Sequence, residues 1–456
     1  MNIITKDKSF YKSLIALAVP AALQNLITFA VGFADNLMVG ALGDIAVSGV
    51  YMGGQIQTFL QIFSAGIEGT VLILSAQYWG KGDRGSIKKI VSVGLRFSLI
   101  FGAVITVLCF VFPKFIISLF AKETAVIEAG ADYLKIVCLS YIFFCITQTL
   151  IAAMRSVEVV KIGTAVSFMS LVINVVLNYV LIFGINGVVS PLGVKGAAIA
   201  TLVSRIAETA VTTVYVFVLD KRLELKPFEL LTCDRAFLKD FVKYGAPIIA
   251  GQLVWSVNMM ANSAILGRFS SGVITAASVA NTMHSLAYVG MNGMSAAVGI
   301  ITGKTVGAGE TEKMKEYAKT VQVLFFMLGL IMGGVITLLK MPFIGLYTGI
   351  TPEAAEYSRQ FITVLSVTMI GTCYQAAGLF GLVKSGGDVG FVFKNDAIFV
   401  FLVVLPSAII ASHLGAPAWV VFACLKCDQI LKCFVAAVKI NKFNWMKNLT
   451  KTGEAA

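Results

Sequence analysis

Four oxygen-bearing side chains lie at similar depth inside long apolar segments of this 456-residue sequence. Asp35 lies near the end of the first segment, Asn178 near the end of the fifth, and Thr201 near the start of the sixth; Asn174 lies one helical turn from Asn178. Hard cations prefer carboxylate, carbonyl and hydroxyl oxygens. The pattern predicts a small site for a proton or a sodium ion. Hydrogen bonding between helices is the alternative role for the two asparagines.

Intramembrane acids are the strongest chemical signal in this sequence. A carboxylate inside a membrane span costs about 2.5–3.5 kcal/mol on insertion scales, so it usually faces a cavity or a partner. Burial disfavours its charged form, which would let Asp35 exchange a proton near neutral pH; a solvated position at the outer end of its helix is the alternative. Glu68, in the middle of the second segment, is the second acid to test. Arg205 and Glu208, three residues apart, are expected to form an ion pair.

The elements that position these residues are membrane spans. Hydrophobic residues make up 58% of the chain and charged residues 13%, with a mean hydropathy of +0.87, whereas soluble domains carry about 25% charged residues. A span needs about 20 mostly apolar residues. Turn and breaker residues divide the chain into twelve predicted spans: 14–42, 47–80, 90–114, 131–156, 160–184, 194–220, 240–267, 273–307, 316–340, 355–384, 391–413 and 417–440.

The net charge of +12 is a topology signal. On this span assignment 27 basic residues lie on one side of the membrane, and Arg96 and Arg205 lie within spans. The opposite side carries seven basic residues: Lys114, Lys122, Lys135, Lys195, Arg268, Lys340 and Arg359. Positively charged loops stay in the cytoplasm, so both termini are predicted to be cytoplasmic. The distribution does not indicate a nucleic-acid-binding surface.

The second half of the chain repeats the first. A shift of 227 residues brings Pro20 onto Pro247, Gly40 onto Gly267 and Gly66 onto Gly293, and the alignment drifts by a few residues later. Because six spans return the chain to its starting side, the repeat is parallel and its pseudo-twofold axis is expected along the membrane normal. The sequence predicts an all-α membrane protein of two six-helix bundles: residues 1–220, a cytoplasmic linker at 221–239, and residues 240–456 with a cytoplasmic tail.

The two halves differ in their chemistry. The mate of Asp35 is Asn262, and the mate of Glu68 is Ser295. Asp388 and Asp396 are interpreted as loop and cap residues. Pro20 and Pro247 remove backbone hydrogen bonds within their spans and are candidates for hinges or for shared packing. Five residues of the second half are candidates for a substrate cavity that would bind an organic cation, with packing or lipid contact as the alternative: Gln252, Trp255, Asn258, Tyr288 and Met291.

Several motifs together resemble one known family. They are Asp35-Asn36-Leu37-Met38-Val39-Gly40, Gly80-Lys81-Gly82-Asp83, Leu181-Ile182-Phe183-Gly184, Gly193-Val194-Lys195-Gly196-Ala197-Ala198, Lys384-Ser385-Gly386-Gly387-Asp388 and Trp445-Met446-Lys447-Asn448. In this order and at this spacing the sequence resembles the multidrug and toxic compound extrusion (MATE) family of bacterial efflux transporters. The likeness covers nearly the whole chain.

The resemblance implies a V-shaped pair of six-helix lobes that exports amphipathic, often cationic compounds in exchange for protons or sodium ions. It points to the same cluster around Asp35, and it associates bending at Pro20 with coupling. Related members carry an Asp where this sequence has Asn178, so only Asp35 supplies formal charge here. The resemblance also implies a monomer in the bacterial cytoplasmic membrane, without a cofactor other than the coupling ion.

Other functions are weighed against this one. A flippase for lipid-linked saccharides or another lipid is the main alternative, although such relatives usually have additional spans and more basic cavities. A membrane-embedded enzyme would need His, Asp or Ser groups clustered near one face, and the sequence shows no such pattern. An ATP-driven pump would need a GxxxxGK[ST] loop, which the sequence lacks.

Overall fold

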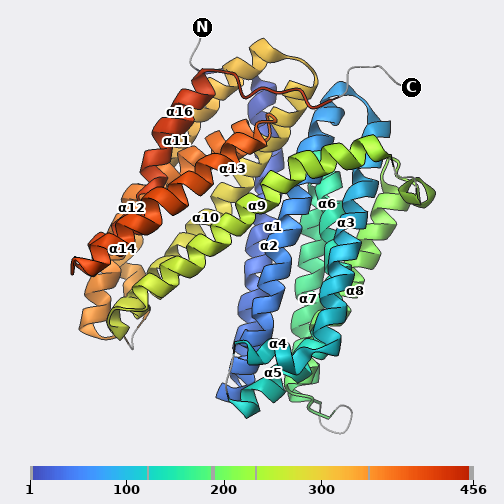
Figure 1. The fold of residues 1–456 in the computed structure, drawn as a ribbon. Coiled ribbons are helices and arrows are strands. Elements are labelled where there is room, and N and C mark those ends of the chain that lie inside the picture. The colour runs from blue at the N-terminus through green and yellow to red at the C-terminus, as the bar shows by residue number, and fades with distance from the viewer. Residues whose placement is uncertain (1–3, 121–122, 186–189, 232–233, 348–349, 451–456) are drawn as a thin grey trace. The chain divides into compact units, whose positions relative to one another are not determined.

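The computed structural model describes residues 4–120, 123–185, 190–231, 234–347 and 350–450. Every regular element in these ranges is a helix (Figure 1). The first half of the chain contains α1 (Lys8–Gly40), α2 (Asp44–Lys81), α3 (Arg84–Val111), the short α4 (Pro113–Ser118), α5 (Thr124–Val137), α6 (Ser140–Ser156), α7 (Lys161–Phe183) and α8 (Val194–Val214), which the π-helical segment η1 (Tyr215–Leu219) extends.

The second half begins with the 3-10 helix η2 (Pro227–Leu231) and then contains α9 (Arg235–Leu266), α10 (Ser271–Gly307), α11 (Thr311–Gly345) and α12 (Pro352–Gln375). The π-helical segment η3 (Ala376–Lys384) extends α12. Next come α13 (Val389–Ile398), the π-helical segment η4 (Phe399–Val404), α14 (Leu405–His413), α15 (Ala418–Lys426) and α16 (Asp428–Asn441). A helix or a run of consecutive helices covers each of the twelve predicted spans, so the predicted all-α, twelve-span architecture is confirmed.

Most of these helices meet the length and hydropathy of a membrane span. Nine helices in the described ranges do so, and α5 with α6, bent by 50° between them, makes a tenth span. The other two spans are α9 and the α15–α16 pair, which are more polar. Arg235, Lys239, Asp240 and Lys243 lie in the first turns of α9, while Lys426, Asp428, Lys432 and Lys439 lie in α15 and α16. The charges of α15 and α16 explain why hydropathy alone identifies that span less clearly. In α9 the stretch after Lys243 is uncharged, and Gln252, Asn258 and Asn262 lower its hydropathy.

The chain folds into two compact units. The N-terminal unit holds Leu23–Ser75 and Asp83–Gly245, and the C-terminal unit holds Met1–Ala22, Ala76–Gly82 and Ala246–Ala456. This division differs from the predicted lobes 1–220 and 240–456, because the first turns of α1 and the last turn of α2 group with the second half of the chain, while the first turns of α9 group with the first half. The chain therefore passes between the units inside long helices.

Within the N-terminal unit, α3, α6, α7 and α8 lie side by side (Figure 1). Gly196 on α8 allows the close approach of α7, because a Cβ at this position would lie 2.4 Å from the carbonyl oxygen of Leu181. The segment predicted as a linker is held against α3, since Lys88 Nζ lies 2.9 Å from Glu229 Oε1 and Ser92 Oγ donates to the carbonyl of Leu230 at 2.8 Å. The small residue Gly196 thus lets α7 and α8 approach each other closely.

Within the C-terminal unit, α12 packs against both α11 and α16. A Cβ at Gly329 or Gly333 of α11 would lie within 2.7 Å of the backbone of α12, which is the close contact that small residues four apart allow. Further along α12, a Cβ at Gly371 would lie 2.0 Å from the carbonyl oxygen of Gln429 on α16. The rings of Phe361 and Phe422 stack 4.2 Å apart in the buried core between α12 and α15.

The tail after α16 is bound to the turn between η3 and α13. Trp445 is fully buried and donates a hydrogen bond to the carbonyl of Ile440 at 3.0 Å. The backbone N–H of Lys447 donates to the carbonyl of Gly386 at 2.8 Å. Gln77, in the last turn of α2, accepts from the N–H of Leu449 at 2.7 Å. These bonds fix residues 445–449 as a strap within the C-terminal unit.

Candidate functional site

Asp35 lies on α1, five residues before the helix ends at Gly40, which is about 7.5 Å along the axis. Its carboxylate is half-buried. The side-chain amide of Asn178 donates a hydrogen bond to Asp35 Oδ1 and a second one to Asn174 Oδ1 at 3.1 Å. Asn178 is itself fully buried, and Asn174 is 2% exposed. Three of the four residues singled out from the sequence therefore form one hydrogen-bonded chain.

Asn178 also has an unused acceptor. Within the described residues, no donor reaches its buried Oδ1 atom. Buried polar atoms are normally hydrogen-bonded, so this exception beside a carboxylate leaves one acceptor that a water molecule or an ion would satisfy. The carboxylate of Asp35 and the two amide oxygens supply the oxygen chemistry that a hard cation prefers. The same carboxylate can instead hold a proton.

Thr201 is close to this chain but not hydrogen-bonded to it. It is buried on α8, and its hydroxyl donates to the carbonyl of Ala197 in its own helix at 3.1 Å. Beside it lies Tyr133 on α5, which is also buried and close enough for the charge of Asp35 to act on its hydroxyl. Tyr133 was not a candidate in the sequence analysis, because an aromatic residue in a membrane helix usually only packs.

Arg205 is the second residue that sequence reasoning left out of the site. Its predicted ion pair is confirmed, since its guanidinium lies 2.6 Å from Glu208 Oε2 and both side chains are largely buried. The same guanidinium lies 5.2 Å from the ring centre of Phe144, and its charge also acts on Asp35. The guanidinium is thus paired with Glu208 and adds a positive charge in the neighbourhood of Asp35. The spacing of Arg205 and Glu208 on α8 predicted their pairing but gave no indication of Asp35.

Glu68 belongs to a different part of the N-terminal unit. Ser64 donates to Glu68 Oε1 at 3.1 Å, and the charge of Arg155 acts on it. Arg155 in turn donates to Gln24 Oε1 at 2.6 Å. Gln24 precedes Asp35 by eleven residues, or about 16 Å along α1. Glu68 has the partner that its burial requires, and the structure does not bring it to Asp35.

Both candidate hinge prolines lie inside unbroken helices, Pro20 in α1 and Pro247 in α9. The chain passes between the two units after Ala22 and again after Gly245. Each proline thus lies within two residues of such a crossing point. A proline at this place weakens the helix by one backbone hydrogen bond where the two parts of the helix belong to different units.

The five cavity candidates of the second half do not share one environment. Trp255 is 53% exposed on α9, and Met291 is 3% exposed within the hydrophobic core of the C-terminal unit. Packing therefore accounts for Met291. Tyr288 stacks on His284 with ring centres 5.6 Å apart. Gln252 and Asn258 are half-buried on α9, and no donor in the described residues reaches Asn258 Oδ1.

The C-terminal unit contains a buried charge cluster that sequence reasoning missed. Lys432 Nζ on α16 lies 2.9 Å from Asp396 Oδ1 and 3.0 Å from Asp428 Oδ2, and the Lys432 side chain is 6% exposed. The interpretation of Asp396 as a loop or cap residue is wrong, because it lies inside α13 and pairs with Lys432. Asp388 is the N-cap residue of α13, as expected, but its carboxylate binds Lys439 at 2.7 Å and Lys447 at 2.8 Å.

These features define a class of protein: a polytopic helical membrane protein of duplicated halves, with carboxylates held at depth beside polar and cationic partners. Nothing in the described ranges gathers three or more His, Cys, Asp or Glu side chains as a metal site would.

The sequence model of the MatE family matches residues 20–180 and again residues 247–411. The chain therefore belongs to the MatE family, the family of multidrug and toxic compound extrusion transporters, and it is a secondary transporter and not an enzyme. The two matched segments begin at Pro20 and Pro247, 227 residues apart, which is the shift that the internal repeat predicts. Their ends lie 231 residues apart, in keeping with the drift later in the repeat.

Individual relatives agree with this assignment. The chain is 26% identical over 373 residues to a probable multidrug resistance protein NorM of Thermotoga maritima, covering 79% of each chain. It is similar in fold to the crystal structure of a MATE protein in complex with MaL6, with a TM-score of 0.85, 18% identity and 95% and 97% of the two chains covered. The Vibrio cholerae MATE transporter VcmN in its bent form gives the same TM-score at 16% identity, with coverage of 95% and 97%.

Proposed function

We propose that this chain is a multidrug efflux antiporter, which exports amphipathic, cationic organic compounds in exchange for protons or sodium ions. Membership of the MatE family supports transport, and the relative from Thermotoga maritima is named a probable multidrug resistance protein. The carboxylate of Asp35 would carry the coupling, and no cofactor other than the coupling ion is expected.

One observation carries the coupling part of this proposal. Asp35 accepts a hydrogen bond from Asn178, whose own buried Oδ1 atom lacks a donor within the described residues. A proton on Asp35, or a cation between the carboxylate and the amide oxygens, would neutralise the only acid in this chain of hydrogen bonds. Ion binding would in this way change the hydrogen-bonded chain that joins α1 to α7.

The conformational change that accompanies transport would take place in the helices through which the chain passes from one unit to the other. Pro20 and Pro247 lie within two residues of the crossing points in α1 and α9. Since α1 also carries Asp35, a bend at Pro20 would link the protonation of Asp35 to the position of the first turns of the helix. We propose Pro20 as the hinge for coupling and Pro247 as its counterpart in the second half.

The substrate would bind through residues of the second half. Trp255 offers an exposed aromatic face on which an organic cation can stack, and Gln252 and Asn258 offer amide oxygens on the same helix. Tyr288 is a further aromatic candidate. Antiport requires that the ion and the substrate favour different conformational states of the transporter. A ligand shifts the equilibrium between two states only by its differential affinity for them.

We further propose that the protein resides in the bacterial cytoplasmic membrane as a monomer with both termini in the cytoplasm. Support comes from the distribution of basic residues, 27 of which lie on the side assigned to the cytoplasm.

A transport assay under separate gradients tests the proposal. The purified chain is reconstituted into liposomes, and movement of a cationic fluorescent dye is followed under a proton gradient alone or a sodium gradient alone. Dye movement against its own gradient, driven by one of the two ions, is the expected result. An absence of driven movement with either ion contradicts antiport. Movement of a fluorescent lipid without any ion gradient would instead favour the flippase alternative.

A further inference from the structure

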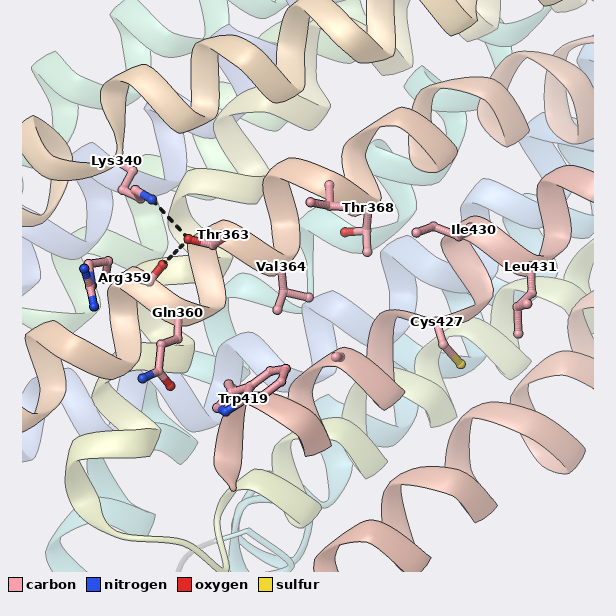
Figure 2. A pocket seen from close by; sticks show the side chains of 12 residues that line it. Lys340, Arg359, Gln360, Thr363, Val364, Thr368, Trp419, Cys427, Ile430 and Leu431 are labelled. Carbon is pink, nitrogen blue, oxygen red and sulfur yellow. Dashed lines mark hydrogen bonds between the residues drawn. The ribbon is translucent and has the colours of Figure 1, made fainter. Parts of the chain in front are cut away.

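The C-terminal unit contains a cavity that none of the candidate coupling, hinge or substrate residues lines. This cavity of about 730 Å³ runs between α12 on one side and α15 and α16 on the other (Figure 2). Its floor contains Val364, Thr368 and Cys427, and its rim contains Val367, Ile430 and Leu431, which are 39–54% exposed. The cavity is thus an open apolar groove on the helix surface. We call it the α12–α15 groove.

Two close contacts lie near the groove on the same helices. The rings of Phe361 and Phe422 stack in the buried core between α12 and α15. Further along, the backbone of Gly371 on α12 approaches the carbonyl of Gln429 on α16 closely. From Arg359 to Thr368 the groove follows nine residues of α12, or about 14 Å. An apolar chain that lies along this stretch of α12 would contact Val364 and Val367.

The other end of the groove is polar and positively charged. Lys340 from α11 and Arg359 from α12 lie there together with Gln360 and Thr363 (Figure 2). Lys340 Nζ donates to the hydroxyl of Thr363 at 3.2 Å. Arg359 binds Glu356 at 2.8 Å, so the three charged side chains leave one net positive charge. A guanidinium has five N–H donors, and some of them remain for a further acceptor.

Lys340 and Arg359 lie near the ends of their helices, where the edge of the hydrocarbon layer is expected. Lys340 lies five residues before the end of α11, and Arg359 lies seven residues after the start of α12, which is roughly 8–10 Å from either end. Trp419, 44% exposed in the first turn of α15, lies beside them. Tryptophan concentrates at the level of lipid headgroups, and cations at such depth extend towards phosphate.

Basic residues are few on the predicted outer side of the protein, so their meeting at one groove is unusual. The predicted outer side of the protein carries seven basic residues in all, and two of them meet at this one groove. Arg268, on the same predicted side and in the same unit, is exposed in the turn before α10 and does not line the groove. The charge is therefore local to the groove rather than a general property of this side.

We propose that the α12–α15 groove is a binding site for one anionic phospholipid. The lipid phosphate would accept hydrogen bonds from Lys340 and Arg359, and one acyl chain would lie along Val364, Val367 and Leu431 towards Cys427. Charge complementarity selects an anionic headgroup over a zwitterionic one, because one basic residue near a membrane surface is worth about 1 kcal/mol towards an anionic lipid, equivalent to about fivefold in affinity.

The fluorescence of the native Trp419 reports lipid binding in the groove, because bromine atoms of a bound lipid quench it. The full chain is placed in nanodiscs of phosphatidylcholine into which either brominated phosphatidylglycerol or brominated phosphatidylcholine is titrated. The signal of Trp419 is taken as the quenching in the wild type minus that in Trp419→Phe. We expect brominated phosphatidylglycerol to reach half-maximal quenching at a mole fraction about fivefold lower than brominated phosphatidylcholine does. The matched variants are Lys340→Gln and Arg359→Gln in the groove, with Arg268→Gln as the control outside it.

Each outcome decides the proposal. A preference for the anionic lipid that both groove variants reduce and Arg268→Gln retains supports it. Equal quenching by both lipids overturns the choice of headgroup. A preference that Arg268→Gln reduces as much as Lys340→Gln overturns the choice of site, because it would then reflect general surface charge. An absence of quenching, with the groove covered by a second copy of the chain, overturns lipid binding altogether. None of these readouts depends on transport.

Discussion

The side-chain amide of Asn178 on α7 donates a hydrogen bond to the carboxylate of Asp35 on α1, although 143 residues separate them in the sequence. The same amide holds Asn174, one turn away on α7. A neutral amide, and not a second acid, is therefore the direct partner of this carboxylate. If Asp35 is the coupling group, its charge state controls one hydrogen-bonded link between two membrane helices.

Replacing Asp35 with Asn should abolish ion-driven transport while the protein still folds. The substitution keeps the shape of the side chain but removes the group that holds a proton or a cation. The measurement is dye uptake into liposomes under the ion gradient that drives the wild type. Asp132→Asn is the matched control, since this acid lies on α5 in an exposed ion pair with Lys195 at 3.1 Å. Undiminished transport by Asp35→Asn would exclude Asp35 from coupling.

Replacing Lys432 with Met should destabilise the protein by about 3–5 kcal/mol, because it leaves two buried carboxylates without their cation. Thermal unfolding in detergent measures the loss. Neutralising the whole cluster, with Asp396→Asn and Asp428→Asn added, should restore much of the stability. Lys313→Met removes an exposed pair with Glu310 and should cost less than about 1 kcal/mol. Equal effects of Lys432→Met and Lys313→Met would show that burial of the cluster is unimportant.

Replacing Gly386 with Ala should release the C-terminal strap. A Cβ there would lie 2.3 Å from a ring carbon of Trp445, which is fully buried and cannot move away without losing its packing. We expect a loss of about 3 kcal/mol or more, similar to removing a buried aromatic side chain, and faster proteolysis after residue 442. Gly390→Ala is the control, because a Cβ at this helical position meets no atom within 4 Å. A strap that is cut equally fast in both variants would contradict this account.

The strap should also depend on pH through Asp388. Burial raises the pKa of this carboxyl, but the hydrogen bonds and charges of Lys439 and Lys447 outweigh it, so the pKa lies below its ordinary value of 3.8. Stability from a carboxylate with a lowered pKa is present above the unfolded pKa and is lost as the pH falls through the folded one. The advantage of the wild type over Asp388→Asn in melting temperature should therefore stay constant from about pH 7 to 5 and shrink below pH 3.8. A difference that grows on acidification would reverse the assigned sign.

Much of the fold could be predicted from the sequence, because a membrane span leaves a signal in consecutive residues. Backbone groups must be satisfied within each span, so length and hydropathy locate helices without any knowledge of their partners. The repeat was equally accessible, since Pro20 and Pro247 keep their spacing along the chain. The ion pair of Arg205 with Glu208 followed from a spacing of three residues within one helix.

The packing between helices could not be predicted in the same way. Asp396 is 36 residues from Lys432, and nothing in the local sequence around either residue indicates that α13 and α16 bring them together. The α12–α15 groove likewise depends on where Gly371 lets α12 approach α16 and where the two helices leave a space. Such distances follow from side-chain packing across the whole unit.

The sequence alone determined that this chain is a twelve-span helical membrane protein of two related halves, and that Asp35 and Glu68 of the first half have the neutral mates Asn262 and Ser295 in the second. Only the tertiary structure decided which polar groups meet: that Asp35 is joined to Asn178 and lies near Arg205, that Glu68 belongs with Arg155, and that Lys432 lies between two carboxylates. The physical reason is the range of the forces concerned. Burial in lipid acts on each residue separately and is recorded in composition, whereas hydrogen bonds and ion pairs act over a few ångströms and form only where packing brings distant residues together.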